Sequence, residues 1–374
     1  MARIETTHTG SLPRPEGLTT LLVEVEEGRA PAGLAERANA AVADVVARQL
    51  AVGLDIVNDG EQGKIGYSTY VRDRLSGFSG EPTPRPQSRD LVGHEDFVAL
   101  SVQLRGRPRV MLPPCTGPIA LADPEAAPRE VAALVAAGRA AGVGPERLFM
   151  SAASPGVIAL FFENHYYPSR EEYLHAIVEA MRTEYRAIID AGLTLQLDCP
   201  DFAMSYNTVF ADLSVDEFRS EVALAVEALN LAVADLPPER IRLHLCWGNF
   251  EAPHTHDIAL ADVIDLVLRA NPAGIVLEAA NPRHGHEWQV FERVALPEDK
   301  YLVVGVLDTT TNFVEHPELI AQRLRNYADL VGPERVMAGN DCGFSTFIGY
   351  NRVAPSIVWE KMAAMVEGAR LASS

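Results

Sequence analysis

Residues 214–246 read SVDEFRSEVALAVEALNLAVADLPPERIRLHLC, and this stretch contains both elements of a repeating unit. Ser214 precedes Glu217 by three positions, which is the capping-box pattern that begins a helix. The helix is predicted to run to about Leu236. The short apolar run 241–245 that follows is typical of a buried strand. The stretch therefore predicts one helix followed by one strand.

The same alternation recurs along the chain. Further helices are predicted at residues 34–52, 169–190, 257–270 and 317–330. Apolar runs that predict buried strands lie at residues 56–57, 148–150, 195–197, 275–277, 302–307 and 336–338, and residues 5–11 supply a first strand. Repeated strand–helix units indicate a parallel sheet, and eight strands without a break in composition favour a closed (β/α)8 barrel of the TIM type. We therefore expect an α/β fold in which residues 1–374 form a single TIM-barrel domain.

Residues 79–120 do not fit this alternation. They are rich in Pro, Gly and Arg, and they contain two extended runs, at Phe97–Leu104 and Arg109–Leu112. We interpret this region as a β-ribbon inserted after the second strand. In the alternative, Arg109–Pro118 is itself a barrel strand, the count rises to nine, and Leu148–Met150 leaves the barrel.

The composition excludes several classes of protein. Among the 374 residues, 51 Asp and Glu outnumber 32 Lys and Arg, which gives a formal net charge of −19. Nucleic acids and anionic membranes both require a positive surface, so we expect neither as a partner. No run approaches the roughly 18 apolar residues of a membrane span, and the N-terminus lacks the apolar core of a signal peptide, so we expect a cytoplasmic protein. The composition leaves open whether the chain forms a homo-oligomer.

Four cysteines are too few to make a disulfide scaffold in a chain of this length. In a reducing compartment each is a buried apolar residue, a metal ligand or a nucleophile. We interpret Cys115, which lies in the insertion, as structural. Cys199, which follows Asp198, is either structural or an extra thiol in the site. Cys246 and Cys342 follow predicted strands and are therefore candidates for chemistry.

Nearly every predicted strand ends in a polar residue. In a TIM barrel the carboxyl ends of the strands form the active-site face, so side chains from distant positions converge there. The residues at these ends are Ser11, Asp59–Glu61, Ser154, Asp198, His244–Cys246, Glu278, Asp308 and Asp341–Cys342. In the alternative interpretation, the carboxylates Asp59, Glu61 and Asp198 are solvated residues at the starts of loops.

The segment His244-Leu-Cys246 is the sharpest element. Residues two apart on a strand point to the same face, so both side chains can reach one ion. Glu278 ends the next strand and Cys342 ends the last one. One imidazole, two thiolates and one carboxylate suit tetrahedral Zn²⁺ better than Mg²⁺ or Ca²⁺, so we expect these four residues to bind zinc.

Three segments resemble the zinc-ligand segments of cobalamin-independent methionine synthase. They are His244-Leu-Cys-Trp-Gly-Asn-Phe250, Val276-Leu-Glu-Ala-Ala280 and Asn340-Asp-Cys-Gly-Phe344. Three more resemble other strand ends of that family, namely Thr9-Gly-Ser-Leu-Pro-Arg14, Asp59-Gly-Glu61 and Leu195-Gln-Leu-Asp198. The family's Thr-Gly-Pro strand end is matched literally by Thr116-Gly-Pro118, whereas Ser154-Pro-Gly156 agrees better with the strand count. The resemblance covers the whole chain but only the catalytic, C-terminal half of the long enzyme.

The resemblance implies zinc-dependent transfer of a methyl or alkyl group to a small thiol such as homocysteine. Zinc would be held by His244, Cys246, Glu278 and Cys342, and the polar end of the thiol substrate by Glu61, Asp198 and the Ser11 region, with Ser154 as a further candidate. A free thiol has a pKa near ~8.5, and a bound Zn²⁺ promotes its ionisation. The thiolate would then attack the donor carbon, which needs an exchangeable position on the metal.

Two departures from the family pattern separate this chain from a strict methionine synthase. After Asp198 the chain reads Cys199-Pro-Asp-Phe202 where the family has Glu-Pro-Ala-Leu, and after the seventh strand it reads Asp308-Thr-Thr-Thr311 where the family has Asp-Val-His. A threonine cannot replace the histidine proton donor. The remaining candidates for catalytic groups are Asp308 and His8, together with the histidines after strands five and six: His254, His256, His284 and His286.

The residues that follow Glu61 admit two interpretations. Tyr67, Tyr70, Arg72 and Arg74 either contact an anionic group of the substrate or form an exposed helix face.

Two alternatives to methionine synthesis therefore stay open. The TIM barrel of this family is shared with uroporphyrinogen decarboxylase and with epoxyalkane:coenzyme M transferases. One alternative is a zinc enzyme that uses another thiol or another electrophile, such as an epoxide or a corrinoid-bound methyl group. The other is a barrel that binds metal without catalysis.

Overall fold

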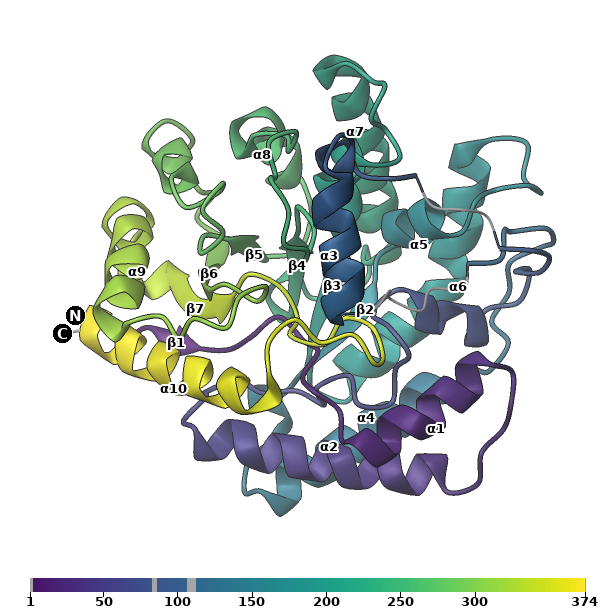
Figure 1. The fold of residues 1–374 in the computed structure, drawn as a ribbon, viewed down its shortest axis with the longest axis horizontal. Helices are drawn as coiled ribbons and strands as arrows, with labels where there is room; N and C mark the ends of the chain where they lie inside the picture. Colours follow the sequence, from purple (N-terminus) through teal and green to yellow (C-terminus); the bar gives the residue numbers. More distant parts are fainter. Residues whose placement is uncertain (1–2, 83–85, 106–111, 374) are drawn as a thin grey trace.

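The computed structural model describes residues 3–82, 86–105 and 112–373 of the protein. Its centre is a curled parallel sheet whose seven strands follow the order β1-β7-β6-β5-β4-β3-β2, with helices outside it (Figure 1). The α/β class is confirmed, and the curled sheet resembles that of a TIM barrel. The strands are β1 (Glu5–Thr6), β2 (Phe149–Ala153), β3 (Thr194–Cys199), β4 (Ile241–Leu245), β5 (Gly274–Glu278), β6 (Tyr301–Leu307) and β7 (Val336–Asn340).

An eighth extended segment lies between the two edge strands. Asp55 N donates to Thr6 O of β1 at 3.1 Å, and Phe149 N of β2 donates to Val57 O at 3.0 Å. The predicted strand at residues 56–57 is therefore reduced to a single parallel bridge. The segment nevertheless lies where the second strand was predicted, between β1 and β2, and it connects these two edge strands.

Ten α-helices lie in the described part of the chain. They are α1 (Glu16–Glu26), α2 (Leu34–Ala51), α3 (Glu95–Arg105), α4 (Ala126–Ala140), α5 (Pro155–Phe161), α6 (Arg170–Asp190), α7 (Val215–Ala232), α8 (Leu260–Val267), α9 (Pro317–Val331) and α10 (Pro355–Ala372). The capping box predicted for α7 is present, since Ser214 N donates to Glu217 Oε2 at 2.9 Å and Glu217 N donates to Ser214 Oγ at 3.4 Å. None of these helices is long and apolar enough to cross a membrane.

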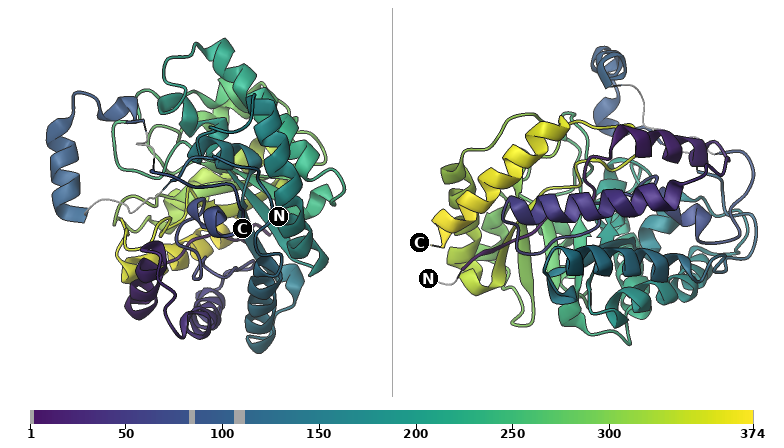
Figure 2. Two further views of the ribbon diagram at one scale, coloured as in Figure 1. Left: turned by 90° about the vertical axis from the view of Figure 1, so that its right-hand side faces the viewer. Right: turned by 90° about the horizontal axis from the view of Figure 1, so that it is seen from below.

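The prediction of a β-ribbon is wrong for Phe97–Leu104, which lies inside α3. Glu95 and Asp96 stand in the first turn, where carboxylates stabilise the positive end of a helix, and this signal outweighs the apolar run. Figure 2 shows α3 standing apart from the body of the fold. The other run, Arg109–Leu112, lies outside the described residues except for Leu112.

The nine-strand alternative is also wrong. Cys115 forms only isolated bridges, with Phe78 and with Asn164, and no barrel strand. Phe149 and Met150 stay in the sheet, because β2 pairs in parallel with β3 over five residues. Consequently Ser154-Pro-Gly156, and not Thr116-Gly-Pro118, follows a strand of the sheet.

Hydrogen bonds between Asp55 and Thr6 attach the segment at residues 55–57 to β1, and we expect them to stabilise the fold. Asp55 Oδ2 accepts from Thr6 N at 2.9 Å and from Thr6 Oγ1 at 3.0 Å. We expect Asp55→Ala to lower the free energy of unfolding by about 1–3 kcal/mol, because the buried Thr6 donors lose their acceptor. Equilibrium urea denaturation measures the change.

Asp44→Ala is the matched control, since the Asp44 side chain on α2 is 65% exposed beside Arg48. A surface change of this kind stays within about 0.5 kcal/mol. Equal losses in the two variants would contradict a role of Asp55 in connecting the sheet edges.

Candidate metal and substrate site

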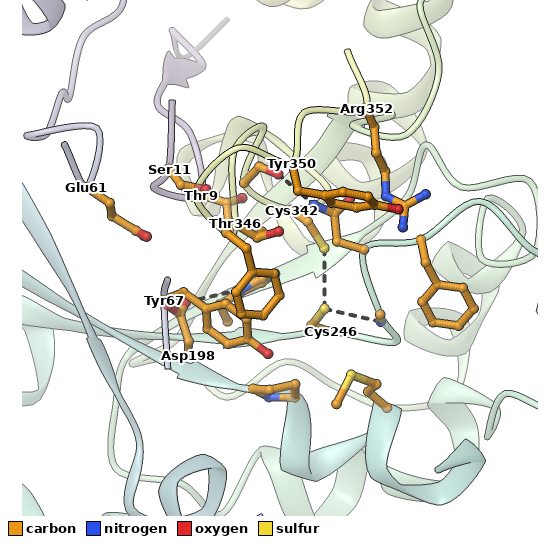
Figure 3. Close-up of a pocket in the computed structure, with 18 of the residues that line it drawn as sticks. Thr9, Ser11, Glu61, Tyr67, Asp198, Cys246, Cys342, Thr346, Tyr350 and Arg352 are labelled. Atoms are coloured by element: carbon orange, nitrogen blue, oxygen red, sulfur yellow. Dashed lines mark hydrogen bonds and ion pairs between the residues drawn. The ribbon is translucent and has the colours of Figure 1, made fainter. Parts of the chain in front are cut away.

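A cavity of about 190 Å³ opens at the carboxyl ends of the strands (Figure 3). Most of the residues predicted from the strand ends meet in its wall, although they are far apart in the sequence. They are Ser11, Glu61, Asp198, His244, Cys246 and Cys342. The convergence follows from the parallel sheet, whose strands all end at the same edge.

Two thiols and one imidazole form the centre of this wall. The alternation along β4 places His244 on the same side as Cys246, and Cys342 approaches from the end of β7. The potential ligand atoms of all three lie within 4.8 Å of one another. The two Sγ atoms are 3.3 Å apart, and both thiols are free and buried.

Glu278 stands beside this group rather than inside it. Its Oε1 is 3.7 Å from Cys342 Sγ and accepts from Trp247 N at 2.9 Å. Its Oε2 accepts from Asn281 Nδ2 at 3.2 Å. The carboxylate is thus held at the end of β5 and faces the sulfur of Cys342.

The imidazole of His244 is fixed at both nitrogens. Nδ1 lies 3.2 Å from Asp198 Oδ1, and Nε2 lies 3.0 Å from Asp341 O. Burial lowers the pKa of His244, but the hydrogen bond to Asp198 and the charges of Cys246 and Glu278 outweigh burial and raise this pKa to about 9. Whichever nitrogen binds a metal, the other keeps the hydrogen-bond partner that metal-binding histidines normally have.

The donor set fits a divalent cation such as zinc. The hydrogen bond with Cys246, burial, and the negative charges of Glu278 and Asp341 raise the pKa of Cys342 well above its usual value. The two thiols therefore cannot ionise together beside these carboxylates unless positive charge is supplied. Two sulfurs, one imidazole and one carboxylate are ligands that zinc prefers.

Glu61 lies on another side of the cavity, in a strained turn with a positive φ of 53°. Ser151 Oγ donates to its Oε1 at 2.8 Å, and Arg14 Nη2 donates to its carbonyl oxygen at 2.8 Å. Its Oε2 is buried and has no hydrogen-bond partner among the described residues. Burial raises the pKa of Glu61 to about 7. This carboxylate oxygen is free to bind a donor group of a ligand.

Ser154 and Asp308 are among the predicted strand-end residues that do not line the cavity; the others are Asp59, Glu278 and Asp341. Ser154 is the N-cap of α5, since it accepts from Val157 N at 3.1 Å, and it also donates to Asp201 Oδ1 at 3.1 Å. The carboxylate of Asp308 accepts from Thr310 N at 2.7 Å and from Thr311 Oγ1 at 2.7 Å. Both side chains are therefore used to fix local loops.

His8 is a core residue in this structure. Its ring is completely buried, its Nε2 pairs with Gln49 Oε1 at 2.7 Å, and it contacts Phe149 edge-on. Burial is the main cause that lowers its pKa to about 3, so the ring is neutral near neutral pH. It does not line the cavity, and these contacts give it a packing role.

The four histidines considered as proton donors also lie away from the cavity wall. His254 and His284 are buried and share the carboxylate of Asp257. His256 binds Asp90 Oδ1 at 2.9 Å, and His286 is exposed.

Aromatic and cationic residues of the cavity wall were missed by the sequence analysis, apart from Tyr67. They come from the end of α5, from loops that follow the strands and from residues shortly before α10, where no regular spacing marks them. They are Phe161, Phe250, Phe347, Tyr350 and Arg352. Of the residues that follow Glu61, Tyr67 lines the cavity, whereas Tyr70 and Arg74 bind the buried Glu184.

Solved structures with the same fold include methionine synthases. A B12-independent methionine synthase from Shewanella sp. W3-18-1, in complex with selenomethionine, aligns with a TM-score of 0.73 over 99% of this chain and 98% of that one, at 21% identity. A methyltransferase from Methanosarcina mazei aligns with a TM-score of 0.55 over 99% of this chain and 94% of that one, at 15% identity. These likenesses establish the fold.

Sequence relatives also span the whole chain. The methionine synthase of Thermococcus kodakarensis is 25% identical over 370 residues, which cover 98% of this chain and 93% of that protein. The methionine synthase of Sulfolobus acidocaldarius is 23% identical, with 98% and 91% covered. The family model described as the catalytic domain of cobalamin-independent synthase matches residues 161–370, which is more than half of the chain. The chain therefore belongs to the cobalamin-independent synthase catalytic-domain family, as the metal-ligand segments indicated.

Proposed function

We propose that this protein catalyses zinc-dependent transfer of a methyl group to the thiol of homocysteine. The observation that carries the proposal is the meeting of His244, Cys246 and Cys342 in the same cavity as Glu61 and Asp198. Ligands for a thiol-activating metal would thus lie in the same cavity as two carboxylates that can bind an amino group. One substrate that carries both a thiol and an amino group could contact both sets. The names of the relatives support the same activity. We also propose that residues 1–374 form one TIM-barrel catalytic domain.

His244, Cys246 and Cys342 would hold the zinc, with Glu278 as the fourth ligand. When bound, Zn²⁺ would lower the pKa of a substrate thiol into the physiological range. The protein residues keep this site preorganised: Asp198 and the carbonyl of Asp341 fix the imidazole, at 3.2 and 3.0 Å. Glu278 is the hardest donor of the set and stands farthest from the other ligands, so it is the natural ligand to yield to the substrate sulfur.

Glu61 and Asp198 would bind the amino group of homocysteine. The unpartnered Oε2 of Glu61 requires a hydrogen-bond donor, and an ammonium group supplies both the proton and the opposite charge. Asp198 lines the same cavity and already orients His244. Binding the amino group at these carboxylates would therefore place the thiol toward the metal ligands.

A second candidate is the same thiol chemistry directed at another methyl donor, such as a corrinoid-bound methyl group. It is favoured by the loop 308–311, where threonines stand in place of the family's histidine. Thr309 Oγ1 donates to Asn249 Oδ1 at 3.0 Å, and Asp308 is engaged by Thr310 and Thr311. A donor whose leaving group needs no histidine proton would suit this loop. Comparing methyl-folates, methylated corrinoids and epoxides as donors with homocysteine fixed distinguishes the two.

We expect zinc-edge X-ray absorption on the purified protein to show sulfur ligands, with one sulfur more after addition of homocysteine. Cys342→Ser should remove the sulfur-coordinated zinc and the transfer activity, because even changes outside the ligand shell weaken metal binding by about 10–100-fold. Cys115→Ser is the control, since Cys115 is an equally buried free thiol outside the site. Retention of the sulfur shell and of activity in Cys342→Ser would refute the assignment.

The pKa of Glu61 predicts a pH dependence of substrate binding. Because this pKa is raised to about 7, the carboxylate fraction grows as the pH rises through about 7. We expect KM for homocysteine to fall over the same range, and Glu61→Gln to raise KM roughly tenfold and flatten the profile. Steady-state kinetics across this range measure both effects.

Asp308→Asn is the control for this profile, because Asp308 does not line the cavity. It should leave the pH dependence of KM unchanged. An unaltered KM profile in Glu61→Gln would show that the amino group binds elsewhere.

A further inference from the structure

A second cluster of metal-binding side chains lies behind the wall of the cavity. His254, Asp257 and His284 place one potential ligand atom each within 4.8 Å of one another. His254 Nδ1 lies 2.6 Å and His284 Nε2 lies 3.1 Å from the same atom, Asp257 Oδ2. All three side chains are nearly inaccessible, with exposures of 5%, 3% and 3%.

The remaining polar atoms of this cluster have the partners that a metal site requires. His254 Nε2 lies 2.8 Å from Phe250 O, which can only accept, so this nitrogen carries a proton and leaves Nδ1 as the ligand. His284 Nδ1 lies 2.9 Å from Glu287 Oε2, which likewise leaves Nε2 as the ligand. A carbonyl and a carboxylate are the usual outer partners of metal-bound histidines.

The charges of the cluster are compatible with a divalent cation. Without a metal, both rings donate at both nitrogens, so two imidazolium charges face the carboxylates of Asp257 and Glu287. A divalent cation between neutral rings would give the same total charge. Binding would therefore exchange two protons for one ion without leaving any buried charge unbalanced.

We propose that His254, Asp257 and His284 form a second, structural site for a divalent transition-metal ion of the zinc class. Two imidazoles and one carboxylate are suitable donors for such an ion. The rings are covered by aromatic side chains, since Trp247 packs on His284 at 4.2 Å and Phe250 on His254 at 4.5 Å. This enclosure leaves no room for a substrate and indicates a structural role.

The ion would brace one wall of the substrate cavity. Phe250 lines that cavity, and its carbonyl is bound to His254. Trp247 follows Cys246 directly, and its N–H binds Glu278. Fixing the two rings would hold this loop in place beside the first metal site. The inference is independent of the proposed function, because it concerns other ligands.

Metal titration of a variant that lacks the first site tests this inference. The full-length protein carrying Cys246→Ser and Cys342→Ser is stripped with a chelator, and Zn²⁺ is then added. We expect one equivalent to remain bound after gel filtration, with release of about two protons per ion. Co²⁺ in its place should give a spectrum without a thiolate charge-transfer band.

Adding His284→Gln to this double variant should abolish the retained equivalent, whereas adding His256→Gln should not. His256 is the matched control, because it is a neighbouring histidine bound to Asp90 outside the cluster. Failure of the double variant to retain zinc, or undiminished retention after His284→Gln, would overturn the inference.

If the variants do not fold, anomalous diffraction at the zinc edge from crystals of the wild-type protein tests the second site instead. A peak between His254, Asp257 and His284 supports the site, and its absence from crystals grown with zinc overturns it. If the wild-type protein held no sulfur-bound zinc, or did not methylate homocysteine, that result would contradict the proposed function and not the second metal site.

Discussion

Two buried thiols, an imidazole and two carboxylates converge where β4, β5 and β7 end, and the two thiols can ionise together there only if a cation joins them. Cys246 and Cys342 stand 3.3 Å apart, and Glu278 is 3.7 Å from the second sulfur. Asp341 accepts from the backbone N–H groups of Ala279 and Ala280, which ties the end of β7 to the end of β5. The electrostatic requirement of the site is thus built into the contacts that hold the strand ends together.

The opposite side of the cavity is stabilised by the hydrogen bonds of a buried arginine, Arg14. Arg14 donates to the carbonyl oxygens of Glu61, Lys64 and Ser345, each at 2.8 Å. This buried guanidinium stabilises the left-handed turn at Glu61, which a residue with a Cβ adopts only at a cost. The turn aims the carboxylate across the cavity toward Asp198. Its backbone strain is therefore compensated by hydrogen bonds that lie outside the reacting groups.

Residues that were grouped together by their place at strand ends separate in the structure into two kinds. Glu61, Asp198, His244, Cys246 and Cys342 line the cavity, whereas Ser154 and Asp308 use their oxygens to cap a helix and a loop. A strand end alone cannot distinguish these roles. The direction of a side chain depends on whether a nearby backbone N–H already binds it.

The sequence alone determined the α/β class, the parallel order of the units and the grouping of His244, Cys246 and Cys342, because a two-residue spacing on a strand and the alternation of helix and strand are local properties. It could not determine α3, where acidic residues in the first turn outweighed an apolar run, or the reduction of residues 56–57 to a single bridge. Only the tertiary structure decided that His8 belongs to the core and that Phe347, Tyr350 and Arg352 line the cavity. It alone also brought His254 and His284 to one carboxylate. Those outcomes depend on loops packed between distant segments, and no periodicity in the chain encodes such contacts.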